Sequence, residues 1–308
     1  MKTVSILIPC YNEEQNIVPI YHALGNICDN NHNYHWEILF VNDGSNDDTL
    51  EIIKQISGKD EKVKYIGLSR NFGKESALLA GLDHITGDCT IIIDADLQHP
   101  PHLINDMLQL WEEGYDDVYA QRLSRGKESW IRRKLTLLYY SLLQKIAKID
   151  ILPNVGDFRL LDKKCVKALT QLRETQRYNK GLYCWIGFRK KKITFDQADR
   201  AQGKSSFNYY KLINLAIEGI TSYTTAPLRI STFAGFIVSM TAFIYMCYIL
   251  IKTILYGDPV QGYPTLIIVI LFLGGIQLLS LGIIGEYLGR IFHETKNRPV
   301  YIIEEKKI

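Results

Sequence analysis

Residues 91–100 read Ile-Ile-Ile-Asp-Ala-Asp-Leu-Gln-His-Pro, so a run of three isoleucines ends in two carboxylates. Such an apolar, β-branched run is typical of a strand that is buried on both faces. Comparable runs precede it and alternate with helical stretches: strands at residues 4–8, 37–41, 63–68 and 89–93, helices at residues 13–27, 47–57 and 74–86. This alternation predicts a doubly wound, mostly parallel α/β sheet, whose ligands bind beyond the carboxyl ends of its strands.

The C-terminal part of the 308-residue chain has a different, largely apolar composition. Residues 233–255 contain one charge, Lys252, and residues 266–288 contain one, Glu286. Each run is long enough to cross a hydrocarbon core of roughly 30 Å. Basic residues flank the two runs and are absent from the loop between them, so the positive-inside rule predicts a hairpin in the cytoplasmic (inner) membrane with both termini cytosolic. A buried hairpin of a soluble protein is the alternative, which this pattern disfavours.

These patterns predict a cytosolic α/β domain over residues 1–228 and a membrane domain over residues 229–308. The membrane domain would have transmembrane helices at about 233–255 and 266–288 and a cytosolic tail. Residues 135–149 and 209–223 are two further helical stretches, and their spacing is compatible with packing on the sheet or with lying on the membrane surface. The glycines of the second span would allow close helix contacts, and with them a homo-oligomer.

Composition excludes several classes of function. The formal net charge of +3 is too small to indicate a nucleic-acid partner. The six cysteines form no CxxC pair, which argues against a zinc site and a disulfide framework. The N-terminal residues resemble a strand rather than a secretory signal peptide, so we expect membrane targeting to depend on the C-terminal helices.

Asp94 and Asp96 are the strongest candidates for chemistry. In an extended chain, side chains at i and i+2 point to the same side, and both carboxylates follow a strand at the ligand-binding edge of the sheet. Carboxylate oxygens suit Mg²⁺ or Mn²⁺, which would keep coordination positions for water and for phosphate oxygens. Such an ion can neutralise a diphosphate leaving group. The alternative is that the acidic pair only caps the following helix.

Two other strand ends carry candidate binding residues. Residues 9–13 read Pro-Cys-Tyr-Asn-Glu and follow the first strand, where a tight turn would bring an aromatic ring to the sheet edge. Residues 42–45 read Asn-Asp-Gly-Ser and follow the second strand. Asp43 can accept a hydrogen bond from a base or ribose, or it can serve the turn and a helix cap.

The ordered motifs at residues 5–13, 41–45, 71–74 and 94–98 resemble those of family 2 glycosyltransferases with the GT-A fold. Residues 155–160 (Val-Gly-Asp-Phe-Arg-Leu) and 200–206 (Arg-Ala-Gln-Gly-Lys-Ser-Ser) are similar to later motifs of the polyisoprenyl-phosphate glycosyltransferases. This subgroup includes dolichol-phosphate mannose synthase and the bacterial bactoprenol glucosyltransferases, and its bacterial members share the two-helix anchor. The resemblance spans nearly the whole chain.

The resemblance implies a role for each motif. Residues that line a nucleotide-sugar pocket would be Pro9, Tyr11, Glu13, Asp43 and Asp94. Metal ligands would be Asp94, Asp96 and Gln98. Residues near an acceptor phosphate would be Arg122, Arg132 and Arg200. The catalytic carboxylates would be Asp157 and Asp96, where Asp157 orients the acceptor or Arg159, with action as a general base the weaker alternative.

The function implied is inverting transfer of one hexose to polyprenyl phosphate on the cytosolic leaflet, for later cell-envelope glycosylation. We expect glucose from UDP-glucose as the donor, and GDP-mannose, UDP-N-acetylglucosamine and modified pentoses are the open alternatives. A lipid phosphate is already anionic, so holding two anions together and stabilising the leaving diphosphate are the harder tasks, which arginines and a metal ion perform. The sequence lacks the QxxRW motif of processive synthases, which favours transfer of a single sugar. The alternatives are a transferase for another lipid acceptor, such as diacylglycerol, and a non-catalytic nucleotide-sugar-binding membrane protein.

Overall fold

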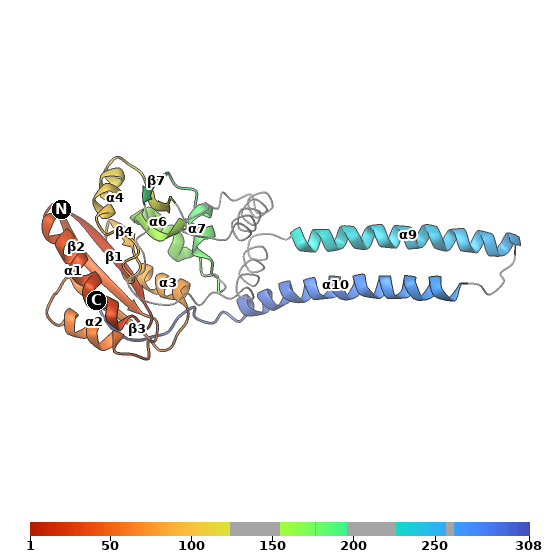
Figure 1. Cartoon of the computed structure of the whole chain (residues 1–308), viewed down its shortest axis with the longest axis horizontal. Helices are drawn as coiled ribbons and strands as arrows, with labels where there is room; N and C mark the ends of the chain where they lie inside the picture. Colours follow the sequence, from red (N-terminus) through yellow and green to blue (C-terminus); the bar gives the residue numbers. More distant parts are fainter. Residues whose placement is uncertain (124–154, 176, 196–225, 257–261) are drawn as a thin grey trace. The chain divides into compact units, whose positions relative to one another are not determined.

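The computed structural model describes residues 1–123, 155–175, 177–195, 226–256 and 262–308 (Figure 1). The chain divides into two compact units, Met1–Leu212 with Arg298–Ile308, and Ile213–Asn297. The helical stretches predicted at residues 135–149 and 209–223 lie outside the described residues, as do Arg132 and Arg200. The predicted division at residue 228 therefore stays a prediction.

The first unit contains the predicted α/β sheet. Eight strands follow the order β7-β5-β6-β4-β1-β2-β3-β8. Strands β4, β1, β2 and β3 are parallel to one another, while β6 is antiparallel to both β4 and β5. Their bounds are β1 Lys2–Cys10, β2 Tyr34–Asn42, β3 Val63–Leu68, β4 Cys89–Ile92, β5 Asp117–Arg122, β6 Val155–Asp162, β7 Lys190–Phe195 and β8 Ile303–Lys307. The doubly wound, mostly parallel architecture predicted from the sequence is confirmed.

Helices cover both faces of this sheet, because its central strands are apolar on both sides. Ile6 and Ile8 of β1 pack into one layer and Leu7 packs into the other. The first layer includes α1 (Glu14–Asn30), α2 (Thr49–Ser57) and α4 (Leu103–Glu112); the second includes α3 (Lys74–His84), α6 (Lys163–Gln171) and α7 (Asn179–Trp185). Gly81 lets α3 approach β1 closely, since a Cβ there would lie 2.1 Å from Leu7 Cδ1. This contact fixes the helix whose N-terminus reaches the carboxyl edge of the sheet.

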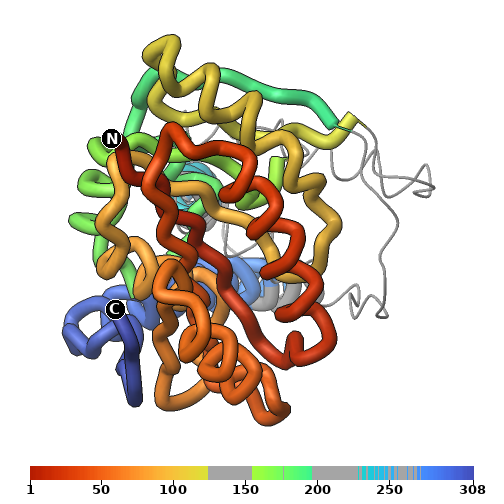
Figure 2. Tube along the Cα trace, turned by 90° about the vertical axis from the view of Figure 1, so that its left-hand side faces the viewer, coloured from red at the N-terminus to blue at the C-terminus, as the bar shows by residue number. Residues whose placement is uncertain are grey.

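The C-terminal tail adds a strand to the sheet, although the sequence suggested only a tail of the membrane domain. Strand β8 pairs antiparallel with β3, and the blue C-terminal end lies beside the orange β3 region in Figure 2. Lys54 Nζ lies 2.7 Å from Glu305 Oε1. Tyr301 Oη donates a hydrogen bond of 2.5 Å to Asp83 Oδ2 on α3. The tail is therefore part of the α/β unit.

The second unit contains two long helices, α9 (Ala226–Tyr256) and α10 (Tyr263–Thr295). The two predicted transmembrane segments lie within them, and Ser231 Oγ donates to Ser280 Oγ at 2.7 Å. In the part of the chain that the structure describes, one stretch, Phe272–Thr295, is long and apolar enough to cross a membrane. None of its apolar window is buried in the protein, and Leu278 is 72% exposed. The two predicted spans are thus helical, and one of them meets the length and hydropathy requirements of a membrane span.

Candidate active site

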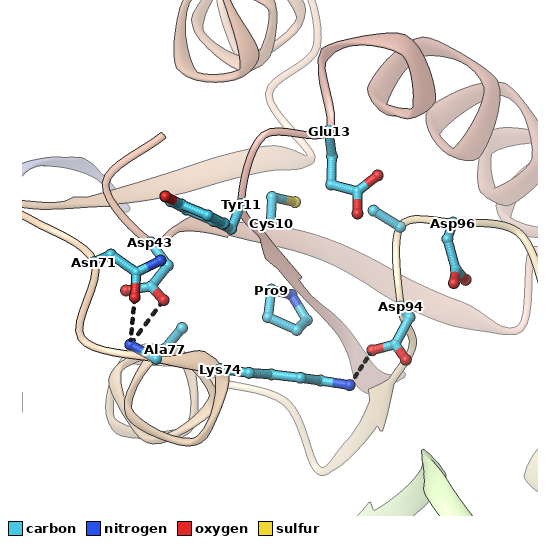
Figure 3. Close-up of a pocket in the computed structure, with 12 residues that line it drawn as sticks. Pro9, Cys10, Tyr11, Glu13, Asp43, Asn71, Lys74, Ala77, Asp94 and Asp96 are labelled. Atoms are coloured by element: carbon cyan, nitrogen blue, oxygen red, sulfur yellow. Dashed lines mark hydrogen bonds and ion pairs between the residues drawn. The ribbon is translucent and has the colours of Figure 1, made fainter. Parts of the chain in front are cut away.

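A pocket opens at the carboxyl ends of β1, β2 and β4, at the sheet edge where the sequence predicts ligand binding. Its volume is about 290 Å³. Twelve residues line this strand-end pocket: Pro9, Cys10, Tyr11, Glu13, Asp43, Asn71, Gly73, Lys74, Ala77, Asp94, Ala95 and Asp96. The fold therefore brings together six of the residues predicted for the site, namely Pro9, Tyr11, Glu13, Asp43, Asp94 and Asp96 (Figure 3).

The turn after β1 is held by the loop after β2. Asn12 has a φ of 55°, a left-handed conformation that asparagine tolerates better than most residues. Its backbone N–H donates to Ser45 Oγ at 2.9 Å, and its side-chain oxygen accepts from the Asn46 N–H at 2.9 Å. The next N–H, that of Glu13, donates to Thr49 Oγ1 at 2.9 Å. These bonds fix the turn on which Tyr11, with 42% of its surface exposed, reaches the pocket.

Asp43 joins the end of β2 to the start of α3. Its Oδ1 accepts from the Phe72 N–H at 2.7 Å and its Oδ2 accepts from the Gly73 N–H at 2.9 Å. An anion is favoured at this position by the helix dipole and by the unpaired N–H groups that precede the helix. Burial raises the pKa of the Asp43 carboxyl above its ordinary value, against the opposing effect of the two N–H groups. Asp43 therefore holds the loop that leads into α3, and its carboxylate also lines the pocket.

Gly44 allows the two loops to meet. It has a φ of +63°, and a Cβ at this position would lie 2.4 Å from the backbone carbon of Arg70. No side chain fits between these two backbones. Glycine is therefore required here for the loop after β2 to pack against the loop that begins α3.

Asp94 and Asp96 follow β4, as predicted, and have different surroundings. Asp96 Oδ1 accepts from the Gln98 N–H at 3.1 Å, across Leu97, whose φ of 57° is uncommon for a bulky residue. Asp94 Oδ1 lies 2.6 Å from Lys74 Nζ. Gln98 is buried and does not line the pocket, so its role as a metal ligand stays a prediction.

Lys74 joins Asp94 to Asp157. Its Nζ lies 2.8 Å from Asp157 Oδ2, and Figure 3 shows the lysine side chain extending from α3 to Asp94 along one side of the pocket. Asp157 is almost buried, which would raise its pKa, but the positive charges of Lys74 and Lys180 outweigh this effect and hold the pKa below its ordinary value. Arg159 Nη1 pairs with Asp117 Oδ2 at 3.1 Å, and the hypothesis that Asp157 orients the acceptor or Arg159 stays a prediction. The partner of Asp157 is Lys74.

Glu75 is a further carboxyl group behind Lys74. Its Oε2 accepts from the Asn179 N–H at 3.0 Å. Burial and the negative charge of Asp157 raise the pKa of Glu75 to about 7. Glu75 is therefore a carboxyl group next to Lys74 whose pKa lies near neutrality.

The residues of the pocket fit a divalent metal ion together with a diphosphate. Four carboxylates and one ammonium group line the pocket, so a diphosphate would be repelled unless cations accompanied it. The described residues contain no group of three His, Cys, Asp or Glu side chains that could hold a metal ion by themselves. Mg²⁺ typically binds through one or two carboxylates and completes its coordination with water and substrate phosphates. Asp94 and Asp96 match this donor set.

Arg122 lies outside the pocket. Its Nη2 is 3.4 Å from His99 Nε2, and since a guanidinium group can only donate, the histidine nitrogen is the acceptor. Burial lowers the pKa of His99, which agrees with a neutral ring that accepts this contact. Of the three predicted acceptor-phosphate residues, Arg122 is the one that the structure describes.

Sequence reasoning missed Lys74, Glu75, Asn71 and Cys10 as part of the site or its surroundings. Lys74 belongs to the motif at residues 71–74, but the motif alone indicates no role for it. Its position after a strand and a Gly-containing loop, at the first turn of a helix, was the available signal. Burial raises the pKa of the Cys10 thiol well above its ordinary value, so this cysteine stays protonated and is not a nucleophile.

Comparisons with known proteins extend over nearly the whole chain. Residues 5–170 match the model of glycosyl transferase family 2, and residues 226–291 match that of the GtrB C-terminal hairpin. The putative glycosyltransferase CsbB of Bacillus subtilis is 46% identical over 305 residues, which are 99% of this chain and 92% of the relative. Bactoprenol glucosyl transferase of Shigella phage SfX is 43% identical over 304 residues, 99% of both chains. Among solved structures, a mycobacterial protein aligns with this chain at a TM-score of 0.50 and 17% identity. The alignment covers 71% of this chain and 73% of the mycobacterial chain, and it shows a similarity of fold alone.

Proposed function

The chain belongs to glycosyltransferase family 2, and on this basis we propose that it transfers one glucose from UDP-glucose to polyprenyl phosphate with inversion of configuration. The observation that carries this proposal is the strand-end pocket, which Asp94, Asp96 and Lys74 line and where Lys74 pairs with both Asp94 and Asp157. The full-length similarity to proteins named bactoprenol glucosyl transferase supports the sugar and the acceptor. The match to the GtrB hairpin supports an acceptor in a lipid bilayer.

The nucleotide binds on the β1–β2 side of the pocket. Tyr11 offers an exposed aromatic ring for stacking, and the oxygens of Glu13 and Asp43 can accept hydrogen bonds from the base or ribose. Pro9 forms the floor between them (Figure 3). Burial raises the pKa of Glu13, while a hydrogen bond of 2.6 Å from Asn16 Nδ2 opposes this effect.

The diphosphate binds on the β4 side. Asp94 and Asp96 would hold Mg²⁺ or Mn²⁺, and Gln98 is the third proposed ligand. As a Lewis acid, the ion would stabilise the negative charge on the leaving diphosphate. The start of α3, with Lys74 in its first turn, presents additional positive charge to the same anion.

The acceptor phosphate needs little activation because it is already an anion. Its oxygen forms a bond to C1 of glucose while the bond from C1 to the diphosphate oxygen breaks, and a single in-line displacement inverts the anomeric centre. Asp157 has a lowered pKa and is therefore a poor base, so its role is to position Lys74 and the reacting groups. Arg122, Arg132 and Arg200 would hold the acceptor phosphate through bidentate contacts.

The site would lie on the cytosolic side of the cytoplasmic membrane. Helices α9 and α10 would both span the bilayer, with the α/β unit and both termini in the cytosol, where nucleotide sugars occur. The product, a polyprenyl-phosphate sugar, would serve later cell-envelope glycosylation.

Sugar transfer by the purified full chain in detergent tests this function. Radiolabelled UDP-glucose, GDP-mannose and UDP-N-acetylglucosamine are each supplied with polyprenyl phosphate or diacylglycerol, with Mg²⁺, Mn²⁺ or a chelator. We expect metal-dependent transfer of one glucose to polyprenyl phosphate, with a β linkage by NMR. Transfer to diacylglycerol alone would overturn the acceptor, and no transfer from any donor to either lipid would overturn the enzymatic function.

A further inference from the structure

Asp94 and Asp157 are negative side chains that the sheet places opposite each other. Strands β4 and β6 pair antiparallel, with Ile92 opposite Arg159. Continuing this register by two residues sets Asp94 opposite Asp157. Like charges directly opposite each other on neighbouring strands are destabilising. A cation between the two carboxylates would relieve this repulsion.

Lys74 supplies that cation, with Nζ at 2.6 Å from Asp94 Oδ1 and 2.8 Å from Asp157 Oδ2. The three side chains differ in exposure: 10% for Asp157, 25% for Asp94 and 43% for Lys74. The buried pair of Arg159 and Asp117 contrasts with them, since those side chains are only 4% and 1% exposed. Lys74 is thus more solvent-accessible than either of its partners, which leaves room for it to exchange one anion for another.

Asp94 is also a carboxylate that a divalent ion in this pocket would use. An ammonium group in contact with that carboxylate competes with the ion for its negative charge and repels it. A metal ion that arrives alone would have to displace Lys74 without offering it another anion. A metal ion that arrives with a diphosphate brings negative charge to which Lys74 can turn.

We propose that Lys74 is a resident counter-cation of the metal site, which occupies Asp94 until a metal and a nucleoside diphosphate arrive together. This inference rests on the proposed function. Lys74 then releases Asp94, keeps Asp157 and faces the diphosphate. Free metal therefore binds weakly and the metal with diphosphate binds tightly, so Lys74 couples the two ligands.

Binding of Mn²⁺ to the full chain in detergent tests this role without sugar transfer. The free Mn²⁺ signal in electron paramagnetic resonance gives the affinity with and without UDP. In K74M we expect Mn²⁺ alone to bind about tenfold more tightly than in the wild type, and the strengthening by UDP to fall by a similar factor. Lys74→Arg keeps the charge and should retain weak binding of Mn²⁺ alone. K64M removes an ion pair of 2.8 Å with Glu37 outside the pocket and should leave Mn²⁺ affinity unchanged.

The outcomes separate this inference from the proposed function. Suppose that the wild type binds Mn²⁺ with UDP, and that K74M binds Mn²⁺ alone no more tightly than the wild type does. This result would overturn the role of Lys74 and leave the proposed function intact. A wild type that does not bind Mn²⁺ even with UDP would overturn the metal-dependent donor site and this inference with it. A thermal unfolding midpoint for K74M close to that of the wild type would show that the lysine variant is folded.

Discussion

Asp43 and Asp94 lie on opposite sides of one pocket, each just beyond the end of a strand, yet they are held by different means. Asp43 accepts two hydrogen bonds from backbone N–H groups, those of Phe72 and Gly73. Asp94 is paired with the side chain of Lys74. Backbone donors cannot leave unless the start of α3 unfolds, whereas a lysine can rotate away.

The two sides of the pocket therefore differ in how easily their contacts can rearrange. The β1–β2 side is preorganised, which suits recognition of a nucleotide whose shape does not change during the reaction. The β4–β6 side can rearrange its charges, which suits a place where metal and diphosphate bind together. Four predictions, taken from the largest expected effect to the smallest, test this contrast.

Asp96→Asn should affect catalysis most. Asparagine keeps the oxygen that accepts the Gln98 N–H at 3.1 Å but removes the negative charge proposed to hold the metal. We expect turnover to fall by about 100-fold or more at saturating donor and metal, a typical loss when a charge-stabilising group is removed. D106N changes an exposed aspartate of α4 and is the control. Turnover of D96N within a few fold of the wild type would contradict the assignment of the β4 side to the diphosphate.

Glu75→Gln should change how stability depends on pH. Because the folded-state pKa of Glu75 is raised to about 7, its protonated form stabilises the fold at low pH, and this contribution is lost as pH rises from about 4.5 through 7. The wild type should lose on the order of 3 kcal/mol relative to E75Q over this range, with no further change above it. Glutamine retains an oxygen for the Asn179 N–H.

Thermal midpoints of the full chain between pH 5 and pH 8 measure this effect. E113Q, a change at an exposed residue after α4, serves as the control. If the thermal midpoints of the wild type and E75Q differ by the same amount at every pH in this range, the surroundings of Glu75 do not disfavour its charged form. In that case the charge of Glu75 would contribute little to the stability of the β6 side of α3, in contrast to the side held by Asp43.

Asp43→Asn should reduce stability more than Asp94→Asn. An amide at position 43 would place its NH₂ group against the N–H of Phe72 or Gly73, donor against donor. Leaving a buried donor unsatisfied costs about 1–3 kcal/mol. D94N loses a contact with a lysine that is 43% exposed, and its effect on the thermal midpoint should be clearly smaller. Equal losses of stability in the two variants would remove the contrast between a fixed and an exchangeable side.

The sequence predicts the ends of the strands better than the side-chain contacts between them. The apolar strand runs locate the ends of β1, β2 and β4, and so the positions of Tyr11, Asp43 and Asp94, because parallel strands end at a common edge. Lys74 and Asp157 meet for another reason, the antiparallel pairing of β6 with β4. No local pattern states which strand becomes the neighbour of β4, so this contact could not be predicted.

The surroundings of Glu75 and the existence of strand β8 could not be predicted from the sequence, because in both cases tertiary contacts override the local preference. Glu75 resembles an ordinary acid in the first turn of a helix, and only its contact with Asn179 on α7 and the nearby charge of Asp157 on β6 reveal its unusual surroundings. Residues 303–307 read Ile-Glu-Glu-Lys-Lys, a charged segment with little strand propensity. They form β8 because the edge of β3 offers unpaired backbone groups and Lys54 offers a partner for Glu305.

Tyr301→Phe tests whether the tail helps to position α3, the helix that both sides of the pocket share. Tyr301 Oη donates to Asp83 Oδ2 near the C-terminal end of α3, and Arg173 contacts the same oxygen at 2.6 Å. Because Asp83 keeps Arg173, loss of the hydroxyl should reduce the free energy of unfolding by only about 1 kcal/mol. Sugar transfer and Mn²⁺ affinity should remain at wild-type levels, since Gly81 against Leu7 and Asp43 at the N-terminus still hold the helix. If transfer instead fell by more than tenfold while the protein stayed folded, the tail would have to be counted with Asp43 among the contacts that preorganise the pocket.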